Sequence, residues 1–519
     1  ESVANVTGFV KFVSAISVTS ISAPHLQTSN GLVITTLPEF ESSPLSLNSL
    51  DLSSYSGSTD NVLIMNCPNL PEVSFPKLAQ TDGDFAVKSC VKLKTISAPL
   101  LTSAAHLEIK NNLNALTTLQ LPALSSLTQA TFQHLAALSA LDLPALKTVT
   151  GYFNISHSPD NNEENTALES VSLPEFTSGD SLLLENNPVL RTLDLPKLVN
   201  LTGYVQIMNC PDLLEVSFPK LAQTDGDFAV KSCVKLKTIS APLLTSAAHL
   251  EIKNNLNALT TLQLPALSSL TQATFQHLAA LSALDLPALK TVTGYFNISH
   301  SPDNNEENTA LESVSLPEFT SGDSLLLETN PVLKTLDLPK LVNLTGYFKT
   351  VFNDAITSIT APELTYVGIL IHSNNTKLSE VYHPKLVENP TASEGKDSCR
   401  VVRGDVDLNF TVPHKDYIID DWVQNCSAGL ETVNVVYSEL YPPPPAPPPP
   451  PSPPPPPPPS PPSPPPPSPP PSPPPPPSPP PSPRPPPPTS APAVSDCNVD
   501  NGGCHGLVSC TNDSENGGA

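Results

Sequence analysis

The sequence predicts an all-β protein whose main part is a parallel, right-handed β-solenoid with coils of 22–23 residues, over residues 1–385. Three observations predict this fold. A short apolar motif ending in proline recurs at a nearly constant interval, apolar residues alternate in pairs within each interval, and one long segment is copied in a whole number of intervals.

The recurring motif has the form apolar-x-(apolar or Ala)-Pro, as in Val73–Pro76 and Leu193–Pro196. Counting along the chain gives sixteen such positions from Pro24 to Pro384, with serine replacing proline at Ser53. Neighbouring positions lie 22 or 23 residues apart, except for 29 after Pro24 and 30 before Pro174 and Pro317. A fixed period of this length is typical of a stacked repeat.

Each interval also contains a second apolar pair and a polar position. In the coil that ends at Pro196 the residues of this pattern are Leu182, Leu184, Asn187, Leu190, Leu193 and Leu195. Two alternating pairs separated by a bend predict two short strands, and a single coil buries its apolar face only by stacking on others. The Asn position, occupied by Cys in some coils, is expected to satisfy backbone groups at the bend.

A long internal duplication respects this period. Residues 72–185 recur identically at 215–328, an offset of 143 residues that corresponds to six complete coils. A solenoid tolerates such a copy because each coil contacts only its neighbours. The identity indicates either a very recent duplication or an assembly error in the underlying sequence.

Three further regions follow the solenoid. Residues 386–441 interrupt the repeat, contain Trp422 and are expected to form a cap closed by a Cys399–Cys426 disulfide. Residues 442–492 are almost entirely Pro and Ser, which predicts a disordered or polyproline II rod because proline fixes φ and lacks an amide donor. Residues 493–519 form a short Cys-rich tail, read as an incomplete small disulfide-rich module.

Four cysteines lie inside the predicted solenoid. Cys67 and Cys90, like Cys210 and Cys233, are 23 residues apart and occupy one column of adjacent coils. Neighbouring parallel strands place such positions about 4.8 Å apart, within disulfide range, although stacking in register gives poor bridge torsions. The sequence leaves disulfides and free thiols as equal alternatives.

Three resemblances to known protein families indicate the cellular compartment of this protein. The "LPxL" coils resemble receptor L-domains and related leucine-rich solenoids, which carry no catalytic motif. The Ser-Pro block resembles the extensin-type hydroxyproline-rich glycoproteins of plant and algal walls. The tail, with Cys497, Cys504 and Cys510 and Asn-Gly-Gly before the second Cys, resembles the first half of an epidermal-growth-factor-like module. This implies an extracellular protein with Cys497 and Cys510 in disulfides, and "AVSD" before Cys497 lacks the calcium-binding pattern.

The composition limits the classes of binding partner that the protein can have. A net charge of −24 argues against nucleic acid, and no apolar run approaches the 18 residues of a membrane span. Membrane anchoring is expected only through a segment beyond residue 519. Nine Asn-x-Ser/Thr sequons are candidates for N-glycosylation: Asn5, Asn154, Asn200, Asn297, Asn343, Asn374, Asn409, Asn425 and Asn512.

Insertions in the two 30-residue coils are the candidate ligand-facing loops. Their acidic residues are Asp160, Glu163, Glu164, Asp303, Glu306 and Glu307. Carboxylate oxygens suit Ca²⁺, but the spacing matches no calcium loop, so a solvated polar loop is favoured and no metal or cofactor is expected. Arg403–Asp405 forms an Arg-Gly-Asp tripeptide, which is a weak adhesion signal.

Catalytic readings are disfavoured. Gly179–Leu182 spells the Gly-Asp-Ser-Leu of one esterase family, but Ser181 falls on an outward-facing position of a repeated coil and no matching Asp-x-x-His is present. The "TDGD" carboxylates, Asp82 and Asp84 with copies Asp225 and Asp227, have no acidic partner at the same phase. His106, His134, His249 and His277 are expected to be isolated and structural.

The sequence therefore predicts an extracellular recognition or adhesion glycoprotein without enzymatic activity. A solenoid displayed on a proline-rich stalk would bind a glycan or a protein. The alternatives are a structural hydroxyproline-rich wall or matrix glycoprotein and, less favoured, a polysaccharide-active β-helix enzyme.

Overall fold

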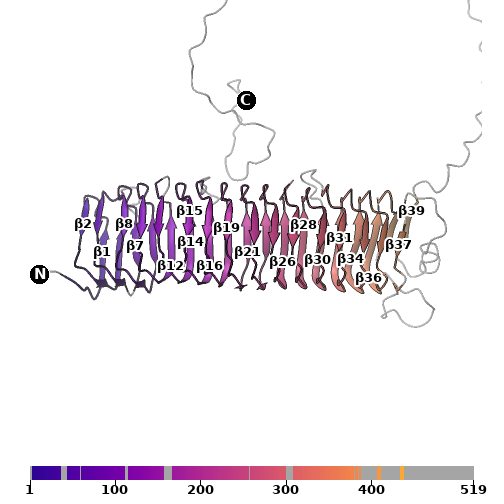
Figure 1. Cartoon of the computed structure of the whole chain (residues 1–519), viewed down its shortest axis with the longest axis horizontal. Helices are drawn as coiled ribbons and strands as arrows, with labels where there is room; N and C mark the ends of the chain where they lie inside the picture. Colours follow the sequence, from indigo (N-terminus) through magenta and orange to yellow (C-terminus); the bar gives the residue numbers. More distant parts are fainter. Residues whose placement is uncertain are drawn as a thin grey trace, which may run out of the picture. The chain divides into compact units, whose positions relative to one another are not determined.

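The computed structural model describes residues 3–36, 44–58, 60–111, 115–156, 166–255, 258–299, 308–373, 375–378, 380–383 and 385–386, with the backbone of 406–410 and 433–437. The regular structure in these ranges is entirely β, so the predicted parallel solenoid is confirmed. The coils follow one another along a single axis (Figure 1). The described residues contain no helix of the length and apolarity needed to cross a bilayer.

One side of the coils forms a broad sheet of 23 strands, which pair in parallel throughout the described residues. Five coils contribute two short strands to this sheet in place of one long strand. The broad-sheet strands are β1 (Phe9–Val13), β3 (Thr28–Ser29), β4 (Gly31–Thr35), β6 (Gly57–Ser58), β7 (Val62–Met65), β9 (Gln80–Thr81), β10 (Phe85–Lys88), β12 (Ser103–Lys110), β14 (Ser126–Gln133), β16 (Thr148–Ser156), β18 (Ser178–Glu185), β20 (Asn200–Leu201), β21 (Val205–Met208), β23 (Gln223–Thr224), β24 (Phe228–Lys231), β26 (Ser246–Lys253), β28 (Ser269–Gln276), β30 (Thr291–Ser299), β32 (Ser321–Glu328), β34 (Asn343–Val351), β36 (Tyr366–Ser373), β38 (Val406–Phe410) and β39 (Val433–Tyr437).

The other side of the coils carries three-residue strands, which form five smaller sheets. These strands are β2 (Ser20–Ser22), β5 (Ser49–Asp51), β8 (Glu72–Ser74), β11 (Thr95–Ser97), β13 (Thr118–Gln120), β15 (Ala140–Asp142), β17 (Ser170–Ser172), β19 (Thr192–Asp194), β22 (Glu215–Ser217), β25 (Thr238–Ser240), β27 (Thr261–Gln263), β29 (Ala283–Asp285), β31 (Ser313–Ser315), β33 (Thr335–Asp337), β35 (Ser358–Thr360) and β37 (Glu380–Tyr382).

Turn residues explain how each coil closes. The landmark proline is the second residue of a four-residue turn, as where the N–H of Leu78 donates to the carbonyl of Phe75 across Pro76. Proline suits that position because its φ is preset. At the opposite corner, one residue in each of twelve coils of the described chain has positive φ, for example Asn66 at 56° and Asn209 at 53°.

The predicted inward residues form the core. In the coil ending at Pro219, Val205, Ile207, Cys210, Leu213 and Phe218 are fully buried. Strands pair so that inward residues stack on inward residues, as with Phe85, Leu107 and Ala130 in β10, β12 and β14. The apolar core therefore runs without interruption from coil to coil.

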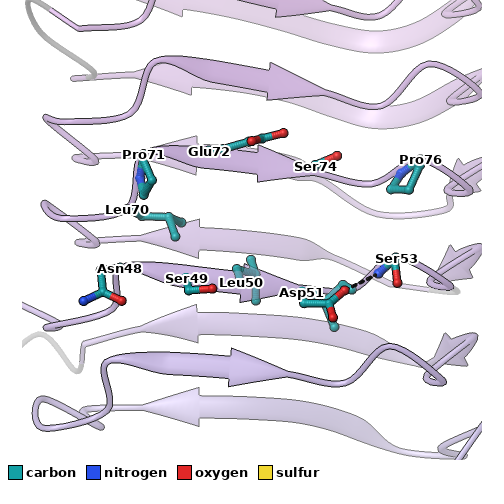
Figure 2. Close-up of a pocket in the computed structure, with 11 residues that line it drawn as sticks. Asn48, Ser49, Leu50, Asp51, Ser53, Leu70, Pro71, Glu72, Ser74 and Pro76 are labelled. Carbon is teal, nitrogen blue, oxygen red and sulfur yellow. Dashed lines mark hydrogen bonds between the residues drawn. The ribbon is translucent and has the colours of Figure 1, made fainter.

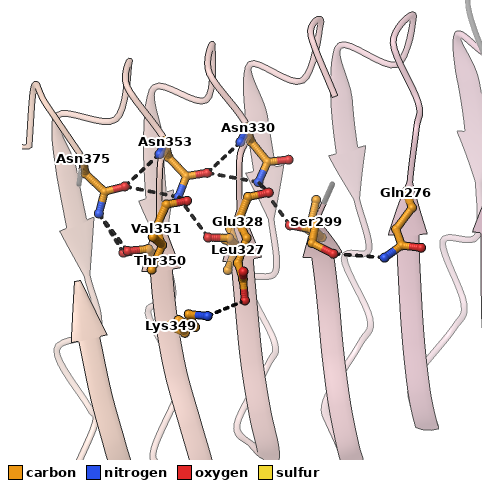
Figure 3. Close-up of polar contacts among 11 residues, drawn as sticks. Gln276, Ser299, Leu327, Glu328, Asn330, Lys349, Thr350, Val351, Asn353 and Asn375 are labelled. Atoms are coloured by element: carbon orange, nitrogen blue, oxygen red, sulfur yellow. Dashed lines mark hydrogen bonds and ion pairs between the residues drawn. The ribbon is translucent and has the colours of Figure 1, made fainter. Parts of the chain in front are cut away.

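The asparagine column has the structural role that the pattern predicts. Nδ2 of Asn353 donates to the carbonyls of Leu327 and Val351 at 2.9 and 3.2 Å, and its Oδ1 accepts the backbone N–H of Asn330 at 3.1 Å. Asn375 repeats the arrangement one coil further on (Figure 3). Each side chain therefore joins adjacent coils through buried hydrogen bonds.

The four solenoid cysteines continue this column as buried thiols that are not joined in disulfides in this structure. The thiols of Cys67 and Cys210 each donate to the carbonyl two residues earlier, at 3.4 Å, as the Asn side chains do. The hydrogen bond of the Cys210 thiol to Cys233 raises the pKa of Cys210 well above its usual value, and burial raises it further.

The broad sheet continues past residue 385. β38 pairs with β36, with Ile371 opposite Asp407, and β39 pairs with β38. The region expected to cap the solenoid therefore adds two strands to it.

Several predicted features lie outside the described residues: Cys399, Cys426, Cys497, Cys504, Cys510, Trp422, the Arg-Gly-Asp tripeptide, Asn374, Asn425, Asn512, the proline-rich segment, and the loop residues Asp160, Glu163, Glu164, Asp303, Glu306 and Glu307.

Candidate functional site on the broad sheet

One outward-facing position of the broad sheet defines a continuous column of polar and aromatic side chains. In each coil it lies one residue before the alternating inward pair, as Ser181 lies before Leu182 and Leu184, and we call it the bulge column. Its members are Asp84, His106, Gln129, Tyr152, Ser181, Tyr204, Asp227, His249, Gln272, Tyr295, Ser324 and Tyr347. The last six repeat the first six at an offset of 143 residues.

β-Bulges place the tyrosines of this column. Between β18 and the next coil, Gly179 pairs with Leu201 and Leu182 with Val205, so Thr202–Tyr204 lies opposite only two residues, Asp180 and Ser181. On the other side of β18, the register with β16 shifts between Val149 and Tyr152. The coil with Ser181 is thus one residue shorter in the sheet than both neighbours, and a bulge of this kind re-aims a side chain.

Hydrogen bonds fix the bulge that carries Tyr204. Thr202 donates to Oδ1 of Asp180 at 3.0 Å, and Ser181 donates to Oδ2 of the same carboxylate at 2.9 Å. The N–H of Tyr204 donates to Oγ of Ser181 at 3.2 Å. Gly203 is required here because a Cβ would lie 2.1 Å from Oγ of Ser181.

The result is a compact group of side chains, Tyr152, Asp180, Ser181 and Tyr204, which we call the first Tyr–Asp cluster. Tyr152 is 38% exposed and lies two coils before Tyr204, with the buried Ser181 between them. Burial raises the pKa of Tyr204, with smaller contributions from the charge of Asp180 and from Tyr152. The Tyr204 hydroxyl is therefore a hydrogen-bond donor at neutral pH.

The second Tyr–Asp cluster, Tyr295, Asp323, Ser324 and Tyr347, has the same geometry. Ser324 and Thr345 donate to Asp323, each at 2.8 Å, and the N–H of Tyr347 donates to Ser324 at 3.0 Å. Tyr295 and Tyr347 are 38% and 43% exposed. Tyr347 lies beyond the identical segment, so the arrangement extends past the exact copy.

Histidine–aspartate pairs lie in the same column. His106 Nδ1 is 2.9 Å from Asp84 and His249 Nδ1 is 3.0 Å from Asp227, and all four side chains are partly exposed. The expectation that His106 and His249 are isolated is wrong, because adjacent coils bring residues 22 positions apart side by side. His134 and His277 are structural, as predicted, and are buried with Nδ1 against Asn111 and Asn254.

Lysine–glutamate triads border the column on the same face. Glu108 forms ion pairs with Lys88 and Lys110, and Glu251 does so with Lys231 and Lys253. Burial opposes ionisation of Glu108, but the hydrogen bonds and charges of the two lysines outweigh it and lower the pKa of this carboxyl. Each triad has two lysines and one glutamate and therefore carries a net charge of +1.

The disfavoured catalytic readings find no support among the described residues. Ser181 occupies an outward register position but is 3% exposed, and its hydroxyl hydrogen bonds Asp180 and Tyr204. The His106–Asp84 pair has Gln129 at the next register position, where a triad would need a nucleophile. No group of three His, Cys, Asp or Glu side chains within the described ranges is arranged to hold a metal.

A pocket of about 270 Å³ lies between the coils that carry β5 and β8 on the short-strand side (Figure 2). These two strands belong to different sheets. In the following coils, Lys94 and Thr117 occupy the position equivalent to Pro71, and the backbone N–H of each donates a hydrogen bond to the preceding coil. Pro71 has no N–H and cannot make this bond. Oδ1 of Asp51 already accepts the N–H of Ser53 at 3.2 Å. The pocket is a polar gap in the ladder, on the opposite side of the coils from the bulge column.

Several sequons also lie on the broad sheet. Asn154 and Asn297 are in β16 and β30, and Asn200 and Asn343 begin β20 and β34. Their Oδ1 atoms are buried and have no hydrogen-bond partner within the described part of the chain. Asn5 is exposed, and its Oδ1 accepts a hydrogen bond from the hydroxyl of Thr28 at 2.8 Å. Asn409 lies in β38, where only the backbone is described.

The Tyr–Asp clusters were missed at the level of sequence, although a signal for them exists. The tripeptide Thr-Gly-Tyr occurs at 150–152, 202–204, 293–295 and 345–347, in the coils on either side of each Gly-Asp-Ser. The glycine of the tripeptide lies close to atoms of the adjacent coil, and the tyrosine occupies the outward-facing position of the bulge column.

Comparisons with known proteins agree with the repeat. Residues 37–154 and 163–248 match six copies of the BspA type leucine rich repeat region, and the solenoid is thus leucine-rich-repeat-like. No curated protein is significantly similar in sequence to this chain.

Two structural likenesses are distant. A chain from the structure of the Toll–Spatzle complex of Drosophila is 14% identical with a TM-score of 0.18, covering 64% of this chain and 51% of that one. A chain from the crystal structure of the TLR13–ssRNA13 complex is 14% identical with a TM-score of 0.14, covering 80% and 81%. This chain thus spans about half the length of the Toll-complex chain. Scores this low carry no argument about function.

Proposed function

We propose that this protein is an extracellular, non-catalytic recognition or adhesion glycoprotein that binds a glycan or a protein through the broad sheet of its solenoid. The proline-rich segment would hold the solenoid away from its point of attachment. The extensin-like Ser-Pro block and the Cys-rich tail support an extracellular location.

The observation that carries the proposal is the bulge column. Its partly exposed tyrosines, histidines and amides run across successive coils on one face. Tyrosine offers a large contact area at low conformational cost, and a solenoid face presents such side chains at a constant interval. The hydroxyl and carboxylate groups expected of a catalytic site are instead engaged in hydrogen bonds that hold the bulges.

A binding assay with a matched control tests the proposal. The labelled full-length chain is applied to an array of immobilised extracellular polysaccharides and matrix proteins. The variant Gln129→Arg/Gln272→Arg places bulky charges in the middle of both halves of the bulge column. The control variant Asp142→Ala/Asp285→Ala changes two exposed residues at equivalent positions on the short-strand side.

We expect the wild type to bind at least one array component, the arginine variant to bind it at least tenfold more weakly, and the control to bind it equally well. Equal binding by all three proteins would show that the broad sheet is not the binding face. Binding lost only in the control would place the site on the short-strand side.

A further inference from the structure

We propose that the two Tyr–Asp clusters are equivalent subsites for the sugar rings of an uncharged polysaccharide, and that one chain engages a single polymer at both. This inference rests on the proposed function and makes it specific. It names the ligand class, the residues that contact it and the number of contacts per chain.

The shape of each cluster suits a flat ring. Tyr152 and Tyr204 lie two coils apart, which places their backbones about 9.6 Å from each other. A ring between two side-chain faces needs roughly 3.5–4.0 Å on each side, and this spacing provides it. The residue of the intervening coil at this register is the small, buried Ser181, so no large side chain at this position separates the two tyrosines.

The polar groups of the cluster match the hydroxyls of a neutral sugar. Each oxygen of the Asp180 carboxylate accepts one intramolecular hydrogen bond, and a carboxylate oxygen can accept a second from a ligand hydroxyl. The hydroxyls of Tyr152 and Tyr204 have no hydrogen-bond partner within the described ranges. A cluster with both donors and acceptors thus faces solvent.

Charge selects against acidic ligands. Each cluster contains an aspartate and no lysine or arginine, and the whole chain has a net charge of −24. A uronic acid or sulfated sugar would place a like charge beside Asp180 or Asp323. The Lys88–Glu108–Lys110 triad carries a net charge of +1, but it lies on β10 and β12, outside the cluster, and Glu108 already pairs with both lysines.

The repetition of the site favours a repeating ligand over a folded protein. The two clusters share the same residues and the same hydrogen bonds, six coils apart, or roughly 29 Å along the stack. A linear polysaccharide presents the same group at regular intervals, whereas a monomeric protein does not. Joining two weak contacts through one polymer raises apparent affinity by about 10²–10⁴-fold.

The experiment compares short and long forms of the same neutral glycans. The probes are soluble xyloglucan, galactomannan and β-1,3-glucan, the trisaccharide of each backbone, and polygalacturonate as the acidic comparison. Isothermal titration calorimetry measures affinity and stoichiometry for the full-length chain after enzymatic removal of N-glycans, because Asn154 lies two residues from Tyr152. The variants are Tyr152→Ala, Tyr295→Ala, both together, and the Asp142→Ala/Asp285→Ala control.

We expect two equal sites for the trisaccharide of one neutral glycan, one site in either single variant at unchanged affinity, and none in the double variant. The corresponding polymer should lose at least tenfold in apparent affinity in either single variant, while the control matches the wild type. Circular dichroism of the variants confirms that they remain folded.

Three results would overturn the inference: one trisaccharide site in the wild type, unchanged stoichiometry in the single variants, or tighter binding of polygalacturonate than of every neutral glycan. If neutral glycans do not bind but the array of the preceding section yields a protein ligand that depends on the broad sheet, this inference fails while the proposed function stands. If neither assay yields a ligand of the broad sheet, both fail.

Discussion

At the scale of single residues, the corner of each coil demands an unusual backbone conformation. The residue before the asparagine column has a φ of 52–58° in twelve coils, and most occupants are Asn, Ser or His. Asparagine tolerates this left-handed region, whereas bulky side chains are strained there. Phe352 adopts a φ of 57° although it is 53% exposed and contributes nothing to the core.

Phe352→Asn is therefore expected to stabilise the solenoid. The equivalent residue six coils earlier is Asn209, which has the same conformation and also donates to Asn186 at 2.9 Å. Relief of the strain should add about 1 kcal/mol to the free energy of unfolding. Urea unfolding of the two proteins measures the difference, and the reciprocal Asn209→Phe should lower stability. A neutral or destabilising Phe352→Asn would contradict this account.

At the scale of the structural element, the asparagine column links each coil to the next. Asn353 is fully buried, and replacing it with leucine would leave the N–H of Asn330 without its partner and remove the side-chain hydrogen bonds to the carbonyls of Leu327 and Val351. The carbonyl of Val351 would keep the N–H of Thr329 as a donor. An unsatisfied buried group costs about 1–3 kcal/mol, so Asn353→Leu should lower stability by about this amount, as measured by denaturant unfolding.

Cysteine provides the matched comparison for this column. Cys210 occupies the position equivalent to Asn353, and its thiol donates to the carbonyl of Met208. Asn353→Cys keeps a donor in place and should cost less than Asn353→Leu. If the two variants lose the same stability, the column acts by packing and its hydrogen bonds contribute little.

A pair of buried histidines makes the end of the described coils sensitive to acid. Nε2 of His372 lies 3.4 Å from Nε2 of His383, and both rings pack on Phe348. Burial lowers the pKa of His372 well below its usual value and that of His383 to about 4. The unfolded chain therefore binds more protons than the folded chain between about pH 6.5 and pH 4.

Stability of these coils should thus be complete above pH 6.5 and fall as the pH drops toward 4, by about 1.4 kcal/mol per pH unit for each histidine that stays neutral. Hydrogen exchange read by mass spectrometry should show loss of protection in β36 and β37 over this range, while β12 and β26 stay protected. Protection in β36 and β37 that is unchanged down to pH 4.5 would contradict the prediction.

At the scale of the whole solenoid, the coil is the unit of folding. Deleting residues 186–328 removes six coils and joins Glu185 to Thr329, the same junction that Glu328 makes in the native chain. Because each coil contacts only its neighbours, this shorter chain should fold with unchanged register. Small-angle scattering should show a solenoid shorter by roughly 29 Å, with similar circular dichroism per residue.

A deletion that is not a whole number of coils is the control. Removing residues 186–317 ends within a coil, so the inward residues on the two sides of the junction no longer align. That protein should aggregate or expose hydrophobic surface to a fluorescent dye. Equal behaviour of the two deletions would mean that cross-coil register does not govern folding.

The sequence by itself determined the coil period, the inward residues, the proline turns and the asparagine–cysteine column. Each of these has a local cause: alternation of apolar residues, a preset φ, or a side chain that bonds its own bend. Leu182, Leu184 and Asn187 are buried as their positions predict, because nothing outside their own coil and its neighbours was needed to place them.

The tertiary structure alone decided what the outward residues do. The Asp84–His106 pair, the burial of Ser181 and the two Tyr–Asp clusters depend on which residues of adjacent coils lie side by side. That alignment shifts wherever one strand is a residue shorter than its neighbour, as β18 is beside Thr202–Tyr204. A one-residue bulge is a property of two coils together, and the pattern within one coil does not contain it.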